Sequence, residues 1–322
     1  MRSLRWIGLL ALYVGAQGIA LLLADPFRSA GLATSTNPQS ATAPIEIVAI
    51  IVIAPLLILW LARQKGGVAT LRHLILFGIA ASLYVTLYAT FSVLPPGLLL
   101  PPPYGAELVI DPALIFAAIV SASLYLLLLM EPQWYVVDLV GFLAAGSLIA
   151  ILGISFAILP AIILLVALLV YDAVAVYGTK HMLSLAEVVT DMKLPILLVM
   201  PDSAGYDYAR APTLSTQRAQ PVEQREALFM GLGDVVIPGT LVVSSFIWLP
   251  STPVVFGVGA NLWAGIGALV GSLLGYAILM RLVLRGNAQA GLPFLNGGAL
   301  AGYILVYFLV FRSLSLGLTG GL

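Results

Sequence analysis

The sequence contains no cysteine, only two histidines and little charge. The absence of cysteine excludes disulfides, thiolate nucleophiles and cysteine-ligated zinc or iron–sulfur sites. With only His73 and His181 available, we expect neither a histidine-based metal site nor a histidine general base. Charged residues make up 9% of the chain, whereas a soluble domain carries about 25%. Most of the surface must therefore face lipid, and the net charge of zero gives no indication of a nucleic-acid partner.

Long apolar runs take the place of the missing charge, since 61% of the residues are hydrophobic. A membrane-spanning helix needs about 20 mostly apolar residues, and nine stretches meet this requirement. They are residues 4–24, 44–62, 73–95, 107–130, 134–153, 158–178, 227–249, 253–280 and 292–312. The sequence therefore predicts an all-α membrane protein with nine transmembrane helices, and it indicates no metal and no cofactor.

The lysines and arginines are distributed unevenly between the two sides that nine spans define. Twelve of the 14 fall on the side of the N-terminus, and only Arg28 and Arg312 fall on the other side. Because cytoplasmic loops carry the excess of basic residues, this distribution places the N-terminus in the cytoplasm and the C-terminus outside the cell. We therefore expect a multi-pass protein of the cell membrane, whose first span is retained rather than removed as a signal peptide.

Two aspartates lie deep inside predicted spans. Asp172 is eight residues before Lys180, and Asp234 is eight residues after Glu226, so each lies roughly 12 Å inside the cytoplasmic end of its helix. The two helices run in opposite directions, so the carboxyl groups can meet at one depth. A carboxylate at the bilayer centre costs about 2.5–3.5 kcal/mol on insertion scales, and two at matched depth indicate a shared site. Asp138 lies nearer to a helix end, and we expect it to be a packing or interface acid.

The chemistry of such a pair favours hydrolysis but does not prove it. Two close carboxylates in a medium of low dielectric constant cannot both ionise, so the pair holds one proton between them. One carboxylate can then take a proton from water while the other protonates the scissile carbonyl oxygen. From depth alone, however, helix–helix hydrogen bonding or a proton or ion site fits at least as well. A proton-coupled transporter or a cation leak channel is therefore the alternative.

The residues around the two aspartates are more specific than their depth. Asp172 follows a tyrosine, and Asp234 ends the sequence Gly-Leu-Gly-Asp in the next span, after a long cytoplasmic segment. This combination resembles the presenilin and signal peptide peptidase family of Gly-x-Gly-Asp intramembrane aspartyl proteases, and archaeal presenilin homologues most of all. The motif match covers roughly residues 171–300, while the first five spans match by hydropathy only.

A third family signature, Pro-Ala-Leu, is replaced here by Ala290-Gly291-Leu292 and followed by Pro293. The resemblance implies that this segment lines the active site and helps to hold substrate, and that Asp172 and Asp234 are the catalytic pair. The residues implied to line the site or bind substrate are Tyr171, Gly231, Leu232, Gly233, Gly291, Leu292 and Pro293. Glycine and proline at the start of the last span also make an unwound segment plausible there.

The resemblance implies an intramembrane aspartyl endopeptidase that cuts transmembrane proteins or peptides without a cofactor. We divide the chain into an N-terminal membrane bundle, residues 1–157, and a catalytic region, residues 158–322, which includes the cytoplasmic loop 179–226. Within that loop residues 181–193 are expected to form an amphipathic helix. Residues 194–200 and the segment near Leu292 are candidate edges for pairing with an extended substrate.

The sequence leaves two other functions open, transport and prepilin-type peptidase activity. The absence of an internal repeat and the position of the aspartates toward the cytoplasmic face disfavour transport. A prepilin-type peptidase also carries Gly-x-Gly-Asp, but its other aspartate usually lies outside the membrane core. A cytoplasmic N-terminus is the presenilin arrangement, which implies substrates whose own N-terminus is outside. The sequence leaves a homo-oligomer open.

Overall fold

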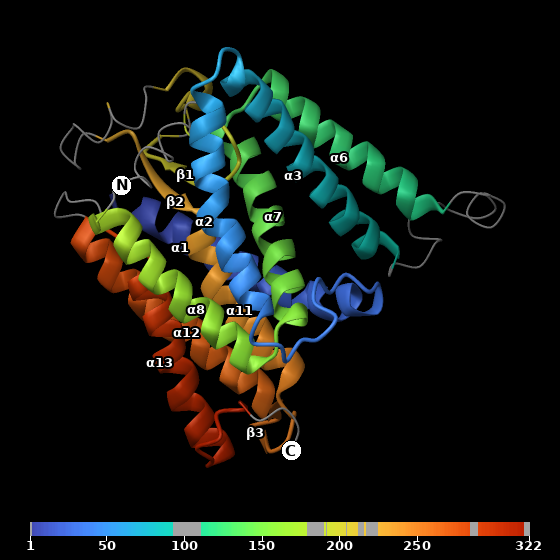
Figure 1. The fold of residues 1–322 in the computed structure, drawn as a ribbon, viewed down its shortest axis with the longest axis vertical. Helices are drawn as coiled ribbons and strands as arrows, with labels where there is room; N and C mark the ends of the chain where they lie inside the picture. The colour runs from blue at the N-terminus through green and yellow to red at the C-terminus, as the bar shows by residue number, and fades with distance from the viewer. Residues whose placement is uncertain are drawn as a thin grey trace.

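The computed structural model describes residues 2–92, 111–178, 190, 192–203, 205–211, 216, 225–283 and 289–318. This part of the chain is almost entirely helical (Figure 1). Its α-helices are α1 (Arg2–Ser29), α2 (Ala43–Ala62), α3 (Gly67–Ser92), α6 (Pro112–Met130), α7 (Trp134–Ser155), α8 (Ile158–Ala173), α11 (Leu232–Trp248), α12 (Ala260–Val283) and α13 (Leu292–Phe311). A π-helical turn (Val174–Gly178) continues α8, and a 3-10 turn covers Tyr208–Arg210.

Eight of the described helices are long and apolar enough to cross a membrane, with α8 counted together with its π-helical turn. The chain is therefore an integral membrane protein with a helical fold. Helix α11, which matches the seventh predicted span, has 17 residues and is shorter than the other eight. The predicted number of nine spans and the orientation of the termini stay predictions.

Short strands occupy the starts of two apolar stretches, so these two helices begin later than predicted. The seventh stretch was expected to begin at residue 227, but Ala227–Gly231 forms β2, which pairs antiparallel with β1 (Leu197–Pro201). The eighth was expected from residue 253, but β3 (Val254–Val255) and β4 (Val258–Gly259) form a hairpin before α12. Its tight turn has Gly257 at φ +78, a left-handed conformation that glycine adopts without strain.

Helix α7 lies at the centre of the molecule and belongs to both hydrophobic cores (Figure 1). The larger core joins α7 to α1, α8, α11, α12 and α13, and its fully buried side chains include Tyr13, Phe27 and Ile149. The smaller core joins α7 to α3, α6 and the strand β1. Helix α2 contributes few buried side chains and exposes Ile50, Ile53 and other apolar residues, as expected of a helix that faces lipid.

The β1–β2 pair separates the two cores. Successive side chains of a strand point to opposite faces, and here Leu198 and Met230 pack into the larger core while Val199 and Ala227 pack into the smaller one. Residues 194–200 were predicted as an apolar segment with an extended edge, and the structure places a strand at 197–201. The predicted amphipathic helix at 181–193 falls almost wholly outside the described residues.

Helices α12 and α13 pack closely because glycines face each other along their contact. A Cβ atom added at Gly271 would overlap the backbone of Gly298, and one added at Gly275 would overlap the carbonyl group of Phe294. Small residues of this kind allow membrane helices to approach one another backbone to backbone. The contact fixes α13, and therefore the start of α13, against the rest of the bundle.

Candidate active site

Asp172 lies in the last turn of α8 and is 7% exposed. Its Oδ2 atom accepts a hydrogen bond of 3.0 Å from the backbone N–H of Leu292, the first residue of α13. The backbone of Gly291 also interacts with this carboxyl group. The first N–H groups of a helix have no partner within the helix, so Asp172 supplies one and ties the end of α8 to the start of α13.

Asp234 lies in the first turn of α11, directly after β2. Gly231 is the N-cap residue, with φ −66 and ψ 139, so Asp234 is the third residue of the helix. An acidic side chain at this position can reach back to the backbone N–H of the N-cap residue, and the Asp234 carboxyl group does interact with the Gly231 N–H. The Gly-Leu-Gly-Asp sequence is therefore a strand-to-helix junction that holds its own aspartate. Asp234 is also close enough to Asp172 to interact with it electrostatically.

Gly291 fills the space between the two aspartates. A Cβ atom added at Gly291 would lie 2.8 Å from Oδ1 and 2.9 Å from Oδ2 of Asp234. The next residue, Leu292, donates its N–H to Asp172. The two consecutive residues 291 and 292 thus contact both carboxyl groups, since Gly291 lies against Asp234 and both residues interact with Asp172 through their backbone. They bring Asp172 and Asp234 to the same place.

The unwound segment that the sequence predicted at the start of α13 is present in part. Gln289 and Ala290 are not helical, Gly291 is the N-cap, and Pro293 stands in the first turn, where its missing N–H leaves no bond unmade. Asn296 donates from its side-chain nitrogen to the carbonyl oxygen of Leu165 at 2.9 Å, so it forms a hydrogen bond between two helices. This bond holds α13 beside α8, one turn from the Asp172–Leu292 contact.

The remaining predicted site residues lie on the same three elements. Tyr171 is partly buried and packs against the larger core. Leu232 donates its N–H to the carbonyl oxygen of Ile196 at 3.1 Å, so it continues the strand pairing into the first turn of α11. Gly233 is exposed, and a Cβ atom added there would meet no atom within 4 Å. These residues lie near Asp172 or Asp234, and Tyr171 is close enough to Asp172 to interact with it electrostatically.

Two features near the aspartates were not foreseen from the sequence as parts of a site. Tyr177 donates its hydroxyl to the side-chain oxygen of Gln289 at 2.8 Å and accepts the N–H of Ala290 at 3.2 Å. The π-helical turn after Asp172 is therefore hydrogen-bonded to the two residues that come before Gly291 and α13. The strand β2 leading into Asp234 was read as part of a helix. Neither the long-range tyrosine contact nor the strand pairing leaves a local signal in the sequence.

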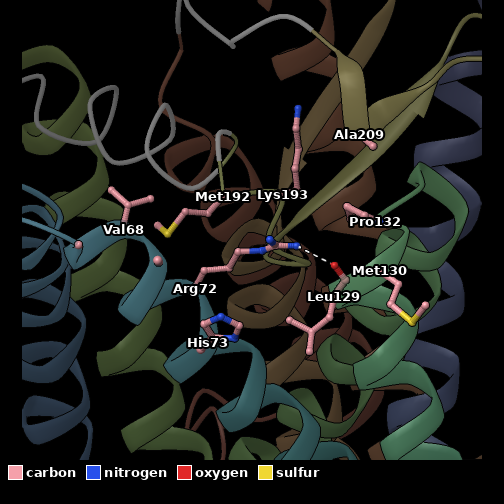
Figure 2. A pocket seen from close by; sticks show the side chains of 11 residues that line it. Val68, Arg72, His73, Leu129, Met130, Pro132, Met192, Lys193 and Ala209 are labelled. Atoms are coloured by element: carbon pink, nitrogen blue, oxygen red, sulfur yellow. Dashed lines mark hydrogen bonds between the residues drawn. The ribbon is translucent and has the colours of Figure 1, made fainter.

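No group of three or more His, Asp and Glu side chains that could hold a metal ion occurs among the residues that the structure describes. A cavity of about 690 Å³ lies elsewhere, between the ends of α3 and α6 and the segment before β1 (Figure 2). Its lining includes Arg72, His73, Met130 and Lys193, and neither aspartate. Arg72 donates to the carbonyl oxygens of Leu128 and Leu129 at the end of α6, so its charge completes a helix end. The arrangement that can perform acid–base chemistry is the pair of carboxyl groups.

Comparisons with known proteins agree with this geometry. The model of the family described as signal-peptide peptidase, presenilin aspartyl protease matches residues 10–313. A solved structure described as a presenilin family intramembrane aspartate protease in space group C222 has a TM-score of 0.65 and 29% identity, covering 95% of this chain and 99% of the other. A second, in space group P2, has a TM-score of 0.61 and 30% identity, covering 94% and 97%. No match was found among curated protein sequences.

Proposed function

The chain belongs to the signal-peptide peptidase and presenilin family and is an intramembrane aspartyl protease, and we propose that Asp172 and Asp234 are its catalytic residues. One observation carries this assignment: residues 291 and 292, at the start of α13, contact both carboxyl groups. Two membrane-embedded acids meeting at one point are costly to bury. Peptide hydrolysis accounts for both, because it needs one carboxyl group as a base and the other as an acid.

Hydrolysis by this pair needs one proton and one water molecule. The ionised carboxyl group accepts a proton from the water, whose oxygen attacks the scissile carbonyl carbon, while the protonated carboxyl group gives its proton to the carbonyl oxygen. The tetrahedral intermediate then transfers a proton to the leaving nitrogen, and the C–N bond breaks. The pair ends with one proton, as it began, so the cycle requires no metal and no cofactor.

The strand pair beside Asp234 supplies partners for an extended substrate. Asp202 donates its N–H to the carbonyl oxygen of Glu226 at one end of the pair, and Leu232 donates to Ile196 at the other. Because hydrogen-bonded and non-bonded positions alternate in an antiparallel pair, the N–H and C=O groups of Phe229 point away from β1. They bond to no other described residue. We expect substrate to pair along this outer edge of β2, which leads directly to Asp234.

We extend the proposal to orientation and substrate. The concentration of basic residues on one side supports a cytoplasmic N-terminus, an extracellular C-terminus and residence in the cell membrane. The substrates are then transmembrane proteins or peptides whose own N-terminus is outside the cell. Residues Tyr171, Gly231, Leu232, Gly233, Gly291, Leu292 and Pro293 are proposed to line the site. The division into a membrane bundle, residues 1–157, and a catalytic region, residues 158–322, is part of the same proposal.

Cleavage of a helical transmembrane peptide by purified protein tests the proposal. Asp172→Asn and Asp234→Asn keep the size of the side chain and remove its titratable group, so each variant is expected to fold and to be inactive. Asp25→Asn makes the same chemical change at an exposed residue of α1 and is expected to cleave like the wild type. Normal cleavage by either active-site variant would refute the assignment.

A further inference from the structure

A third acid, Asp138, is buried in α7 away from the catalytic pair. It is 5% exposed, and its Oδ1 atom accepts a hydrogen bond of 2.7 Å from the backbone N–H of Val199, in the middle of β1. Its Oδ2 atom has no hydrogen-bond partner among the described residues, and neither of the salt bridges found there includes Asp138. A buried carboxyl group without a counter-charge is costly. A packing role alone, which an apolar side chain would perform at lower cost, does not account for it.

The Val199 N–H that Asp138 binds is not used in strand pairing. The bonds from Asp202 to Glu226 and from Leu232 to Ile196 fix the alternation along the pair, and Val199 lies opposite Phe229 in a non-bonded position. Its N–H therefore points away from β2, toward α7. Asp138 fills this hydrogen-bonding site, so β1 does not offer a free edge at its centre. The predicted substrate edge at residues 194–200 is thus covered there by α7.

The same face of α7 is shaped to receive β1. Gly141 is three residues after Asp138, on the same side of the helix. A Cβ atom added at Gly141 would lie 3.3 Å from the carbonyl oxygen of Pro195 and 3.4 Å from a side-chain carbon of Leu198. A glycine and an aspartate one turn apart therefore hold both the start and the middle of the strand.

The far end of the strand pair is held independently by α1. Arg5, 6% exposed, donates to the carbonyl oxygen of Arg225 at 2.9 Å and forms an ion pair with Asp202 at 3.1 Å. These contacts lie beyond the last residues of β1 and before the first residue of β2. Of the two sets of polar contacts described here, the Asp138–Val199 bond is the nearer to the end of the pair that leads into Asp234. Together with the close approach of Gly141, it holds β1, and through the ladder β2, against α7.

We propose that Asp138 is a positioning residue for proteolysis, which sets the position of the β1–β2 pair and thereby selects the peptide bond that reaches the catalytic aspartates. The inference rests on the proposed function, because it requires substrate to pair along β2. Asp138 does not touch the reacting atoms. It acts through Val199, the β1–β2 ladder and the junction at Gly231. A displacement of β1, passed to β2 through the ladder, would move the outer edge of β2 and the substrate paired with it relative to the catalytic aspartates.

The test is the position at which a transmembrane peptide is cut. Asp138→Asn keeps an oxygen that can accept the Val199 N–H, and we expect the wild-type cleavage site and kcat within about twofold. Asp138→Leu keeps the branched shape of the side chain but removes the acceptor. We expect it to cut at displaced or several positions, resolved by mass spectrometry of the products, with kcat at least about tenfold lower and KM less affected. Asp138→Ala, which adds no apolar bulk, gives the same readout where the leucine variant does not fold.

The outcomes separate this inference from the function on which it rests. If Asp138→Leu and Asp138→Ala both cut at the wild-type position, whatever their rate of cleavage, the aspartate is only a stabilising residue. The inference is then overturned. If Asp138→Asn loses activity or shifts the cut, the titratable proton matters and the positioning role is wrong. If the folded wild-type protein itself does not cleave the peptide, the proposed function fails.

Discussion

At the scale of single residues, the site depends on glycine at position 291, which has no side chain. The family pattern has alanine where this chain has Gly291, and the space of the absent methyl group is occupied by the Asp234 carboxyl group. The departure from the pattern therefore has a local physical reason: without a Cβ atom, the start of α13 can lie directly against one aspartate while Leu292 donates to the other. Which atom filled that space was not readable from the sequence, because the neighbour comes from a helix 57 positions away.

Replacement of Gly291 by alanine tests this reading. The new methyl group would lie within 3 Å of three atoms of the Asp234 carboxyl group, so the carboxyl group must move. Since a misplacement of about 1 Å in a catalytic group lowers rates by roughly a hundredfold, we expect Gly291→Ala to lower kcat by about ten- to a hundredfold. Cleavage of a transmembrane peptide under substrate saturation measures this.

Gly297→Ala is the matched control for that prediction. Gly297 lies on the same helix, and a Cβ atom added there meets no atom within 4 Å. We expect normal kcat and a slightly higher melting temperature, because alanine is the better helix former. Equal activity of Gly291→Ala and the wild type would show that the Asp234 carboxyl group is not held where the structure places it.

At the scale of elements, the helices were predictable, but the strands that precede α11 and α12 were not. Apolar stretches of about 20 residues identify membrane helices by length alone, and α2, α7 and α13 begin and end within two residues of the expected bounds. A run such as Ala227–Gly231 is apolar and short, so its sequence does not distinguish a strand from a helix end. Only the pairing with residues 197–201 shows that it is a strand, and a long segment of sequence separates the two.

The contact between the π-helical turn after α8 and the approach to α13 gives a prediction at this scale. Tyr177 is bonded through its hydroxyl to Gln289 and Ala290. Tyr177→Phe removes both bonds and keeps the ring. A neutral hydrogen bond contributes about 0.5–1.5 kcal/mol, so we expect kcat/KM for a transmembrane peptide to fall by about three- to tenfold.

Tyr135→Phe serves as its control. Tyr135 is an exposed residue of α7 whose ring packs against Trp134, a contact that phenylalanine retains. Its activity is expected to equal that of the wild type. If Tyr177→Phe also has wild-type kcat/KM, the hydroxyl does not help to hold the start of α13.

At the scale of the whole molecule, the distribution of charge determines the expected orientation. Twelve of the 14 basic residues lie on one side of the predicted spans, and the positive-inside rule makes that side cytoplasmic. The aspartates are expected near the same side, so we expect the chemistry to take place toward the cytoplasm. Composition gave the membrane class, and the two aspartate motifs gave the family, while the arrangement of α13 between the aspartates required the folded chain.

Because the chain has no cysteine, single introduced cysteines report orientation without background. Thr36, between α1 and α2, and Gln64, between α2 and α3, are both exposed. In intact cells we expect a membrane-impermeant maleimide to label Thr36→Cys, and Gln64→Cys only after permeabilisation. The opposite pattern would invert the topology and place the substrate N-terminus in the cytoplasm.

The most direct measurement of the joint action of Asp172 and Asp234 is single-turnover cleavage of one transmembrane peptide by four purified proteins: wild type, Asp172→Asn, Asp234→Asn and the double variant. Groups that act as one catalytic unit are strongly non-additive when removed. Each single variant is therefore expected to reduce the rate constant to background, and the double variant to be no slower than either. Substantial cleavage by one single variant, or a double-variant loss equal to the product of two partial losses, would contradict a shared active site.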